Sequence, residues 1–303
     1  MAEPRRLERS LMAADTLFRT RFAPSPTGPL HLGHAYSAML AHDLAVQNKG
    51  EFLLRIEDID QSRARTQWED WIFRDLKALG IEWPKPVLRQ SGRLNAYRNA
   101  IQSLWDKRLI YPCTCNRRDI LDAASAPQEG AAPIIGPDGV VYPGTCRNYQ
   151  HDVFLVPPAT TLRLDMRKAI AHLATTDFAF IEQGQGTKTT VDFSADKVID
   201  KIGDIVIART GLGTSYHLSV VLDDAFQKIS HVVRGQDLFE ATKIHVILQK
   251  LFNLPTPVYH HHKLIRDKTG KRLAKRHDAE AIRKYLDNGA TAGDIRKQVG
   301  LRP

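Results

Sequence analysis

The stretch PSPTGPLHLGH, residues 24–34, decides how the first half of this 303-residue chain folds. It follows the apolar run TLFRTRFA (16–23), which is typical of a strand, and it leads into a run with an apolar helical face (31–47). Prolines and glycines at this density force a turn, and such turns often face a ligand. A second apolar strand, EFLLRIEDI (51–59), follows. Strand, helix and strand in this order predict an α/β fold with a parallel sheet covered on both faces.

Hydrophobic periodicity places the remaining elements. Helices are expected near 65–79, 93–107, 239–252, 279–287 and 291–299, and strands near 161–165, 177–182, 204–208 and 229–233. The stretch AASAPQEGAAPIIGPDG (123–139) has little periodicity, so we expect a mobile surface insertion there. The basic stretch KLIRDKTGKRLAKRHDA (263–279) is expected to be an exposed loop.

Composition narrows the class of protein. The net charge of +9 and the pI of about 9.5 favour an acidic partner such as nucleic acid. Three cysteines cannot all pair within the chain, and two of them are Cys113 and Cys115, which fits a reducing compartment and a metal site. No apolar run reaches the roughly 18 residues that a membrane helix needs, and the N-terminus lacks a signal peptide's apolar core. We therefore expect a cytoplasmic protein.

Two motifs can contact phosphate. The turn delivers the chain to a helix N-terminus, where free N–H groups favour an anion, and His31 and His34 share one face of the first helical turn. Gly33 between them would let a flat ring or a phosphate approach the backbone. The alternative is that these histidines merely cap the helix. The run KRLAKR (271–276) carries four cations, which indicates either a phosphate contact or a solvated loop.

Taken together, RFAPSPTGPLHLGH, FLLRIEDID, HVVRGQDL and the lysine-rich loop resemble the catalytic core of class I aminoacyl-tRNA synthetases, in the glutamyl and glutaminyl branch, over about residues 17–280. HLGH stands at that family's HIGH motif and RLAKR at its KMSKS motif, where Arg272 and Ala274 depart from the pattern and Lys275 is kept. In length and motifs the chain resembles the group without an anticodon-binding domain, the glutamyl-queuosine tRNA(Asp) synthetases.

The resemblance implies a function in two steps. ATP and L-glutamate would give glutamyl-adenylate without tRNA, with Mg²⁺ accompanying the ATP, and glutamate would then pass to the queuosine base at the wobble position of tRNA(Asp). One alternative is a truncated glutamyl-tRNA synthetase that charges the 3′ end of tRNA(Glu). Another is a catalytically silent tRNA-binding module. We expect a monomer with no membrane partner.

The resemblance also implies roles for the matching residues. The glutamate-binding positions would be Arg21, Phe22, Ala23, Pro24, Ser25, Glu57, Tyr216 and Arg234. The ATP-binding positions would be His31, Gly33, His34 and Lys275, and His31, His34 and Lys275 would be catalytic. Arg21 would hold the side-chain carboxylate of glutamate and Glu57 its ammonium group. Taken singly, Glu57 could be a surface acid and Arg234 part of a structural ion pair.

Cys113, Cys115, Tyr142 and Cys146 match the zinc-binding pattern of the queuosine-directed group, which implies a structural Zn²⁺ with three thiolates and a phenolate. His151 remains an alternative to Tyr142, and three buried structural cysteines remain an alternative to a metal site.

The expected organisation is a Rossmann-type catalytic domain with a small zinc-bearing insertion and a helical C-terminal segment. Its parts are a flexible extension (1–15), the first half of the catalytic domain (16–110), a zinc-bearing acceptor-binding insertion (111–195), the second half of the catalytic domain (196–262), and the KMSKS-like loop with a short helical segment (263–303).

Overall fold

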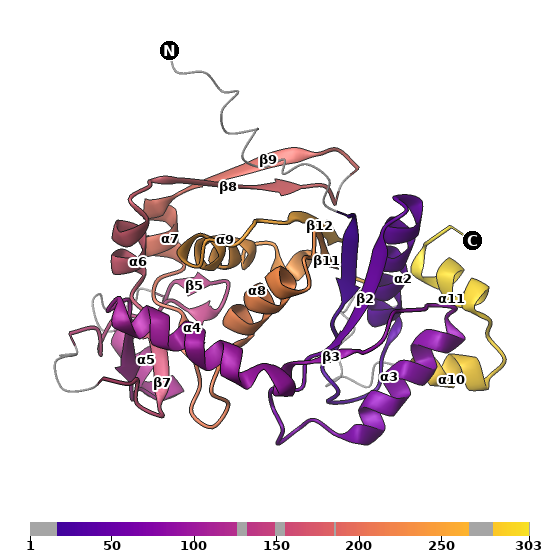
Figure 1. Cartoon of the computed structure of the whole chain (residues 1–303), viewed down its shortest axis with the longest axis horizontal. Coiled ribbons are helices and arrows are strands. Elements are labelled where there is room, and N and C mark those ends of the chain that lie inside the picture. Colours follow the sequence, from indigo (N-terminus) through magenta and orange to yellow (C-terminus); the bar gives the residue numbers. More distant parts are fainter. Residues whose placement is uncertain (1–16, 126–131, 149–154, 185, 267–280, 303) are drawn as a thin grey trace, which may run out of the picture.

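The computed structural model describes residues 17–125, 132–148, 155–184, 186–266 and 281–302, which form an α/β fold (Figure 1). The extension at 1–15, His151 and most of the KMSKS-like loop, Lys275 included, lie outside the described residues. The first half contains β1 (Arg19–Phe22), α2 (Leu32–Gln47), β2 (Glu51–Ile56), α3 (Thr66–Ala78), β3 (Leu88–Arg89), the 3-10 helix η1 (Gln90–Arg93) and α4 (Leu94–Asp106). The helices and strands predicted here are confirmed, with ends shifted by a few residues.

The middle of the chain alternates short strands and helices. It contains β4 (Ile110–Cys113), α5 (Arg117–Ser125), β5 (Ile135–Gly136), β6 (Gly139–Val140), β7 (Thr161–Leu164), α6 (Met166–Leu173), β8 (Asp177–Glu182), β9 (Thr189–Ser194), α7 (Ala195–Lys201) and β10 (Val206–Ala208). The last part contains α8 (Tyr216–Phe226), β11 (His231–Gly235), the 3-10 helix η2 (Gln236–Leu238), α9 (Thr242–Leu251), β12 (Val258–His262), α10 (Ile282–Asp287) and α11 (Ala292–Val299).

The central sheet is mostly parallel, as predicted. β1, β2 and β3 pair in parallel, β11, β12 and β8 pair in parallel, and β9 joins β8 antiparallel. The two groups meet at β1 and β11, where the Ser230 backbone N donates to the Arg19 carbonyl at 3.1 Å and the Arg21 side chain reaches the Val233 carbonyl. Because both contacts advance in the same direction along the two strands, β1 and β11 run in parallel. Strand ends from both groups therefore meet at one edge, where ligands bind in such sheets.

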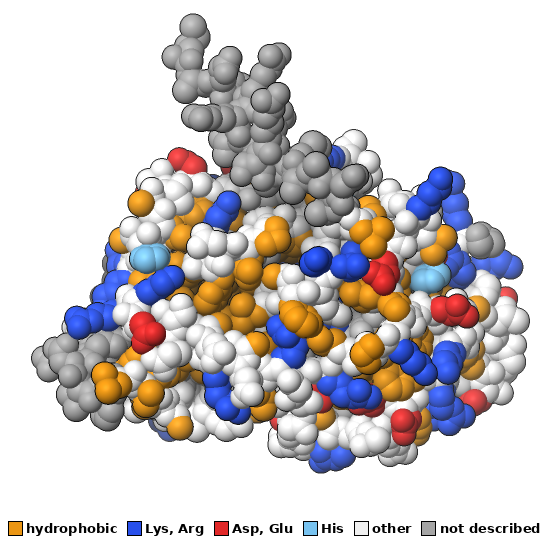
Figure 2. Space-filling view, in the orientation of Figure 1, with side chains coloured by type: hydrophobic (Ala, Val, Ile, Leu, Met, Phe, Trp, Pro, Cys, Tyr) orange, Lys and Arg blue, Asp and Glu red, His pale blue; other side chains and the backbone are white. Residues whose placement is uncertain are grey.

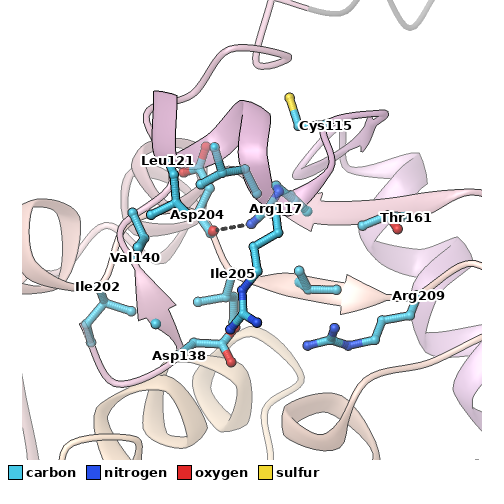
Figure 3. Close-up of a pocket in the computed structure, with 14 residues that line it drawn as sticks. Cys115, Arg117, Leu121, Asp138, Val140, Thr161, Ile202, Asp204, Ile205 and Arg209 are labelled. Atoms are coloured by element: carbon cyan, nitrogen blue, oxygen red, sulfur yellow. Dashed lines mark hydrogen bonds between the residues drawn. The ribbon is translucent and has the colours of Figure 1, made fainter. Parts of the chain in front are cut away.

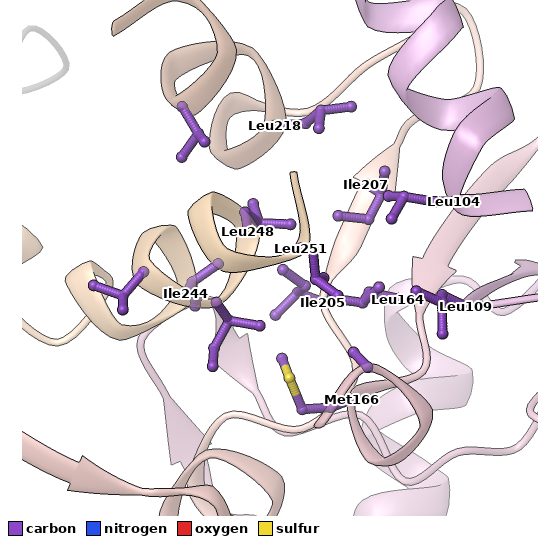
Figure 4. Close-up of a cluster of buried hydrophobic side chains, with 14 of the residues drawn as sticks. Leu104, Leu109, Leu164, Met166, Ile205, Ile207, Leu218, Ile244, Leu248 and Leu251 are labelled. Atoms are coloured by element: carbon purple, nitrogen blue, oxygen red, sulfur yellow. The ribbon is translucent and has the colours of Figure 1, made fainter. Parts of the chain in front are cut away.

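Helices cover both faces of the sheet, which also confirms the prediction (Figure 1). On one face α2, α3 and α11 bury an apolar cluster that includes Met39, Ile72 and Ile295. On the other side α8 and α9 pack with α4, β7 and β10 around Leu104, Leu164 and several isoleucines (Figure 4).

The tight turn between α2 and β2 requires a glycine at position 50 for a steric reason. Gly50 N–H bonds to the Ala45 carbonyl, and the next amide, of Glu51, donates to the Phe18 carbonyl at 2.8 Å. A Cβ on Gly50 would lie 2.0 Å from that carbonyl oxygen, so only glycine lets the turn press against the chain that enters β1.

Some expectations were wrong. The sequence did not indicate β9 or the helices α5 to α8. In α8 the buried residues lie on nearly every side, so no amphipathic stripe is visible in YHLSVVLDDAF. Residues 126–131 of the stretch 123–139, which was expected to be a mobile surface insertion, lie outside the described residues. In the rest of it regular structure is present where none was predicted: α5 extends to Ser125, and β5 and β6 form an antiparallel hairpin in which Ile135 pairs with Val140.

The surface carries its positive charge in a dispersed way. Figure 2 shows more Lys and Arg than Asp and Glu side chains on the viewed face, spread between apolar and neutral groups. Among the helices of the described residues, none combines the length and the apolar character needed to cross a membrane.

The core around β7 gives a stability test. Leu164→Ala should lower the free energy of unfolding by about 2–5 kcal/mol, because Leu164 is completely buried and its truncation leaves a cavity. Urea denaturation of the purified variant measures this loss. The matched control is Leu155→Ala, because Leu155 is 94% exposed, and its effect should stay within about 0.5 kcal/mol. Equal losses in the two variants would contradict this account of the core.

Candidate active site

The HLGH turn forms the N-terminal cap of α2. His31 is the N-cap residue, its Nδ1 accepts from the Gly33 backbone N at 3.1 Å, and the His31 backbone N donates to Nδ1 of His34 at 3.1 Å. The centroids of the two rings lie 3.8 Å apart, with the ring planes tilted by 35°. Because a backbone N–H can only donate, both Nδ1 atoms are acceptors, and each neutral ring carries its hydrogen on Nε2. The predicted shared face of the two histidines is confirmed.

Gly33 has a local role beside the one expected for it. A Cβ there would lie 3.0 Å from Cε1 and 3.1 Å from Nδ1 of His31. The glycine therefore makes room for the ring of His31, which caps the helix, and its contact with ATP stays a prediction. Capping of the helix is compatible with a phosphate-binding role for His31 and His34, because the cap fixes both rings in one orientation.

The same turn is tied to the end of β2. The backbone N of Glu57 donates to the Pro24 carbonyl at 3.1 Å, which brings Ser25 and Glu57 together. Both line a cavity of 540 Å³, together with Tyr216. The other lining residues are Ile59, Asp60, Arg63, Gln90, Arg209, Leu212, Thr214 and Ser215. Three of the eight predicted glutamate-binding residues thus share one cavity, at the edge of the sheet where the parallel strands end.

A buried ion network lies beside Glu57. Nε and Nη2 of Arg21 donate to the two carboxylate oxygens of Asp224 at 2.9 and 3.2 Å. Arg55, which is completely buried, bonds to Asp224 at 2.7 Å and to Glu57 at 3.2 Å. Burial raises the pKa of Glu57, and the charges of Arg55 and Arg21 oppose that rise. Burial would also raise the pKa of Asp224, but Arg21 and Arg55 outweigh it and lower that pKa.

Arg55 and Asp224 were not predicted from the sequence. Arg55 lies in the FLLRIEDI strand and Asp224 in a helix that the sequence did not indicate, so their pairing had no visible signal. Arg21 uses three of its five N–H groups on Asp224 and on the Val233 carbonyl. Phe22, Ala23 and Pro24 form the backbone path between Arg21 and Ser25, with Phe22 and Pro24 buried.

Arg234, at the end of β11, is held by uncharged groups. Its Nε donates to Nε2 of His261 at 3.1 Å and its Nη1 to Nδ1 of His245 at 2.9 Å. Its Nη2 donates to Thr242 Oγ1 at 2.7 Å and to the Leu238 carbonyl at 3.2 Å. Four of the five guanidinium N–H groups are used in this way, which leaves one on Nη1 among the described residues.

Tyr216 lies within the field of both predicted arginines. Burial raises the pKa of Tyr216, while the charges of Arg234 and Arg21 act against that rise. The Tyr216 ring also lies 5.9 Å from the ring of His245, which binds Arg234. Tyr216 lines the 540 Å³ cavity, whereas Arg21 and Arg234 are not among its lining residues. The run His260–His262 supplies a structural partner: His261 bonds to Arg234 and, through Nδ1, to the Glu182 carboxylate.

The loop that carries Lys275 is anchored beside the HLGH turn. Ala281 forms a bridge with His31, and the Ile282 backbone N donates to the Leu30 carbonyl at 2.8 Å. Lys275 itself lies outside the described residues. Five residues lie between it and Ala281, so six Cα–Cα steps separate the two, a length that spans at most about 21 Å when extended.

The three cysteines and Tyr142 form one cluster. The Sγ atoms of Cys113, Cys115 and Cys146 lie within 4.8 Å of one another and could hold a metal ion. Tyr142 Oη lies 3.4 Å from Sγ of Cys113 and of Cys115, and the Cys115 and Cys146 sulfurs are 3.5 Å apart. Around a tetrahedral zinc with Zn–S bonds of about 2.3 Å, neighbouring ligand atoms lie about 3.5–3.8 Å apart. The donor set therefore fits such an ion.

The surroundings act on the ligands of this cluster in different directions, because burial raises the pKa of Cys115 and of Tyr142 whereas the pKa of Cys146 is lowered. Nε of Arg163 lies 3.3 Å from Cys113 Sγ, and its guanidinium lies 3.9 Å from the centre of the Tyr142 ring. The Cys146 backbone N donates to Tyr142 Oη at 2.9 Å. Burial raises the pKa of Cys146, but hydrogen bonds from Tyr142 and the Thr114 backbone outweigh it and bring that pKa to about 7. Three thiolates and a phenolate around one zinc ion would carry excess negative charge. The guanidinium of Arg163, beside Cys113 and Tyr142, would offset part of that charge.

A second cavity, of 510 Å³, lies between the cysteine cluster and β10 (Figure 3). Arg117 from α5, Asp138 from the β5–β6 turn and Arg209 are among its lining residues. Arg209 also lines the 540 Å³ cavity, so the two cavities share one side chain. The sequence did not single out any of these three residues.

The histidines make stability depend on pH. Burial lowers the pKa of six of them, in the case of His231 to about 4. The six are His42, His231, His245, His260, His261 and His262. An unfolded histidine titrates near pKa 6.5. Below that pH the unfolded chain binds more protons than the folded chain, so the free energy of unfolding should fall as the pH drops from about 7 to about 5.

Urea denaturation at the two pH values tests this expectation. Burial raises the pKa of Asp75 to about 6 and also raises that of Glu57, and these two carboxyl groups act in the opposite direction to the six histidines. The variant His231→Gln should show a shallower decline than the unmodified chain. A free energy of unfolding that rises toward pH 5 would contradict the assignment of buried neutral histidines.

Comparisons with known proteins agree with this site. The family model described as tRNA synthetases class I (E and Q), catalytic domain, matches residues 18–133 and 181–302. The chain is 57% identical to the Glutamyl-Q tRNA(Asp) synthetase of Rhodobacter capsulatus over 283 residues, which cover 93% of this chain and 99% of that protein. It is 38% identical to the Glutamyl-Q tRNA(Asp) synthetase of Nocardia farcinica, over 86% of this chain and 77% of that protein.

Among solved structures, the fold is similar to a glutamate tRNA ligase from Elizabethkingia meningosepticum in complex with its amino acid. The TM-score is 0.63 and the identity 25%, over 86% of this chain and 52% of that chain. The chain therefore spans about half the length of that enzyme. The interval between the two stretches matched by the family model, 134–180, contains Tyr142 and Cys146. With the matches covering most of its length, the chain belongs to the class I tRNA synthetases of the glutamate and glutamine branch, within the group of Glutamyl-Q tRNA(Asp) synthetases.

Proposed function

We propose that this protein activates L-glutamate with ATP in the absence of tRNA and then transfers the glutamate to the queuosine base at the wobble position of tRNA(Asp). The observation that carries the proposal is the 57% identity to a protein of that name over 99% of that protein's length. In the first step a carboxylate oxygen of glutamate attacks the α-phosphorus of ATP, and pyrophosphate leaves. In the second step a hydroxyl of the queuosine diol attacks the activated carbonyl, and AMP leaves.

In the proposed binding mode the 540 Å³ cavity takes the glutamate. Glu57, at the end of β2, would accept from its ammonium group, and Ser25 and Tyr216 would line it. Arg21 keeps two N–H groups beyond those used on Asp224 and Val233, and Arg234 keeps one. These donors would meet the carboxylates, while Phe22, Ala23 and Pro24 would contribute backbone groups. A pocket of this polarity would discriminate against glutamine.

ATP would lie along the HLGH turn. Two anions meet in the first step, so positioning and charge neutralisation supply most of the catalysis. His31 and His34, fixed by the helix cap, would donate from Nε2 to the phosphates as charge builds up, and Gly33 would act by allowing that cap. Lys275 would stabilise the departing pyrophosphate. Mg²⁺ bound with ATP would supply further charge neutralisation.

The cysteine cluster would hold a structural zinc. Cys113, Cys115, Cys146 and Tyr142 have the donor types and the spacing for a closed tetrahedral site, with Arg163 beside them. A closed site of this kind would fix β4, α5 and the segment around Tyr142 relative to one another.

Two assays test the proposed function. Glutamate, and not glutamine, should support ATP–pyrophosphate exchange without tRNA. Radiolabelled glutamate should then appear on tRNA(Asp) that contains queuosine, even when the terminal adenosine lacks its 2′ and 3′ hydroxyls, because the acceptor is the base. Transfer to tRNA(Asp) with guanosine at the wobble position should be absent.

Variants in the basic loop supply a matched pair of controls. Lys275→Ala should lower the exchange rate by about 10²-fold or more, as expected for loss of one electrostatic contact to a transition state. Lys268→Ala, in the same loop, should exchange near the unmodified rate.

Two outcomes would favour the alternative functions. Charging of the 3′ end of tRNA(Glu) would support the truncated-synthetase alternative, and absence of exchange under all conditions would support the silent module.

Metal removal tests the zinc site. The purified protein should contain about one zinc per chain, and Cys146→Ser should lose it, because a thiolate ligand is replaced by a weak one. Elemental analysis measures the content, and the melting temperature should fall with it. Ser125→Ala, on α5 of the same region, is the control and should keep its zinc. An unmodified protein that is free of zinc after growth with added zinc would refute the site.

A further inference from the structure

A chain of hydrogen bonds leads from Arg234 to the hairpin of β5 and β6. Nη1 of Arg234 donates to Nδ1 of His245 at 2.9 Å. Nε2 of His245 lies 3.1 Å from Nδ1 of His217, and Nε2 of His217 lies 3.4 Å from Oδ1 of Asp138. The four residues come from β11, α9, α8 and the β5–β6 turn. These hydrogen bonds therefore connect the segment of Arg234 and His245 with His217 and with Asp138, which is far from them in the sequence.

The direction of every hydrogen bond in this chain is fixed by its two ends. A guanidinium can only donate, so Nδ1 of His245 accepts and its hydrogen lies on Nε2. That hydrogen points to Nδ1 of His217, which must accept, so the hydrogen of His217 lies on Nε2 and points to the carboxylate of Asp138. Both rings are therefore neutral and each has a single tautomer.

The environment agrees with this arrangement. Arg234, His217 and His245 are all buried, so each polar atom depends on these partners rather than on water. Burial, followed by the positive charge of Arg234, lowers the pKa of His245 well below its ordinary value. A proton added at Nδ1 of His245 would face an N–H of Arg234. At the other end, hydrogen bonding to His217 outweighs burial and lowers the pKa of Asp138.

We propose that Asp138, His217 and His245 are positioning residues for Arg234, and that they orient its guanidinium toward the proposed glutamate cavity. The series of hydrogen bonds begins at Asp138, in the β5–β6 turn. The inference rests on the glutamate-binding role proposed above for Arg234. Removing the carboxylate at one end frees His217 to turn or to change tautomer. His245 then loses its fixed acceptor state, and Arg234 loses one of the four bonds that hold it.

Asp138 makes an informative test site because of where it lies. It lines the 510 Å³ cavity beside the cysteine cluster and is not among the residues that line the 540 Å³ cavity (Figure 3). An effect of Asp138 on glutamate binding can therefore travel through the two histidine rings or through Arg209, which lines both cavities, and the His245 variants below separate the two routes. A purely structural role in the hairpin would leave glutamate binding unchanged.

The experiment is ATP–pyrophosphate exchange without tRNA, with glutamate and ATP varied in turn. Asp138→Ala should raise KM for glutamate about fivefold or more, the lower end of typical coupling between two sites, while KM for ATP stays near that of the unmodified protein. Asp138→Asn keeps an oxygen that can accept from His217 and should restore KM for glutamate.

The matched control is Asp122→Ala. Asp122 is an exposed acid on α5 of the same insertion, 3.8 Å from Arg118, and has no contact with the histidines in the described structure. It should leave both KM values unchanged. A second pair of variants changes His245, which bonds directly to Arg234. His245→Leu should raise KM for glutamate. His245→Gln has an amide that can both accept and donate a hydrogen bond, so it should raise KM less.

The outcomes separate this inference from the function on which it rests. Exchange by the unmodified protein together with an unchanged KM for glutamate in Asp138→Ala overturns the positioning role and leaves the proposed function standing. Equal effects of Asp138→Ala and Asp138→Asn also overturn it, because the chain requires an acceptor and not a charge. Absence of glutamate-dependent exchange in the unmodified protein overturns both.

Discussion

The pairing of Arg21 and Arg55 with Asp224 and Glu57 is the constraint on which the site depends. These groups are taken out of water where β1, β2 and α8 meet, and a buried charge is tolerated only with a partner. The network therefore forces α8, from the second half of the chain, against the first two strands. It also places Glu57 at the cavity wall while its charge is balanced by Arg55 rather than by solvent.

Arg234 is hydrogen-bonded to neutral groups, whereas Arg21 and Arg55 are paired with carboxylates. In the described part of the chain no carboxylate contacts it directly, since an imidazole stands between it and Glu182 on one side and two imidazoles stand between it and Asp138 on the other. Its positive charge is thus held firmly but not neutralised at close range. A guanidinium in that state suits a substrate that brings its own carboxylate, because the interaction is worth more in a dry pocket than in water.

The insertion is connected to the catalytic half in two ways. Arg209 lines both cavities, and Asp138 ends the histidine chain that begins at Arg234. The cysteine cluster holds the neighbouring strand and the segment around Tyr142, so a metal there would stiffen the wall that carries one of the two cavities. The two cavities are therefore linked by Arg209 and by the histidine rings rather than lying in separate parts of the fold.

The sequence by itself determined the strand–turn–helix order around HLGH and the parallel sheet with helices on both faces, because these follow from local breakers and periodicity. The grouping of Cys146 with Cys113 and Cys115 was implied by the family resemblance. The resemblance to the synthetase family implied Ser25, Glu57 and Tyr216, which share one cavity. The sequence did not indicate that Gly33 serves the cap of His31, that Arg21 is paired with Asp224, or that His217 and His245 support Arg234. Those facts belong to the tertiary structure, because they depend on which buried polar groups from distant segments meet away from water and must satisfy one another there.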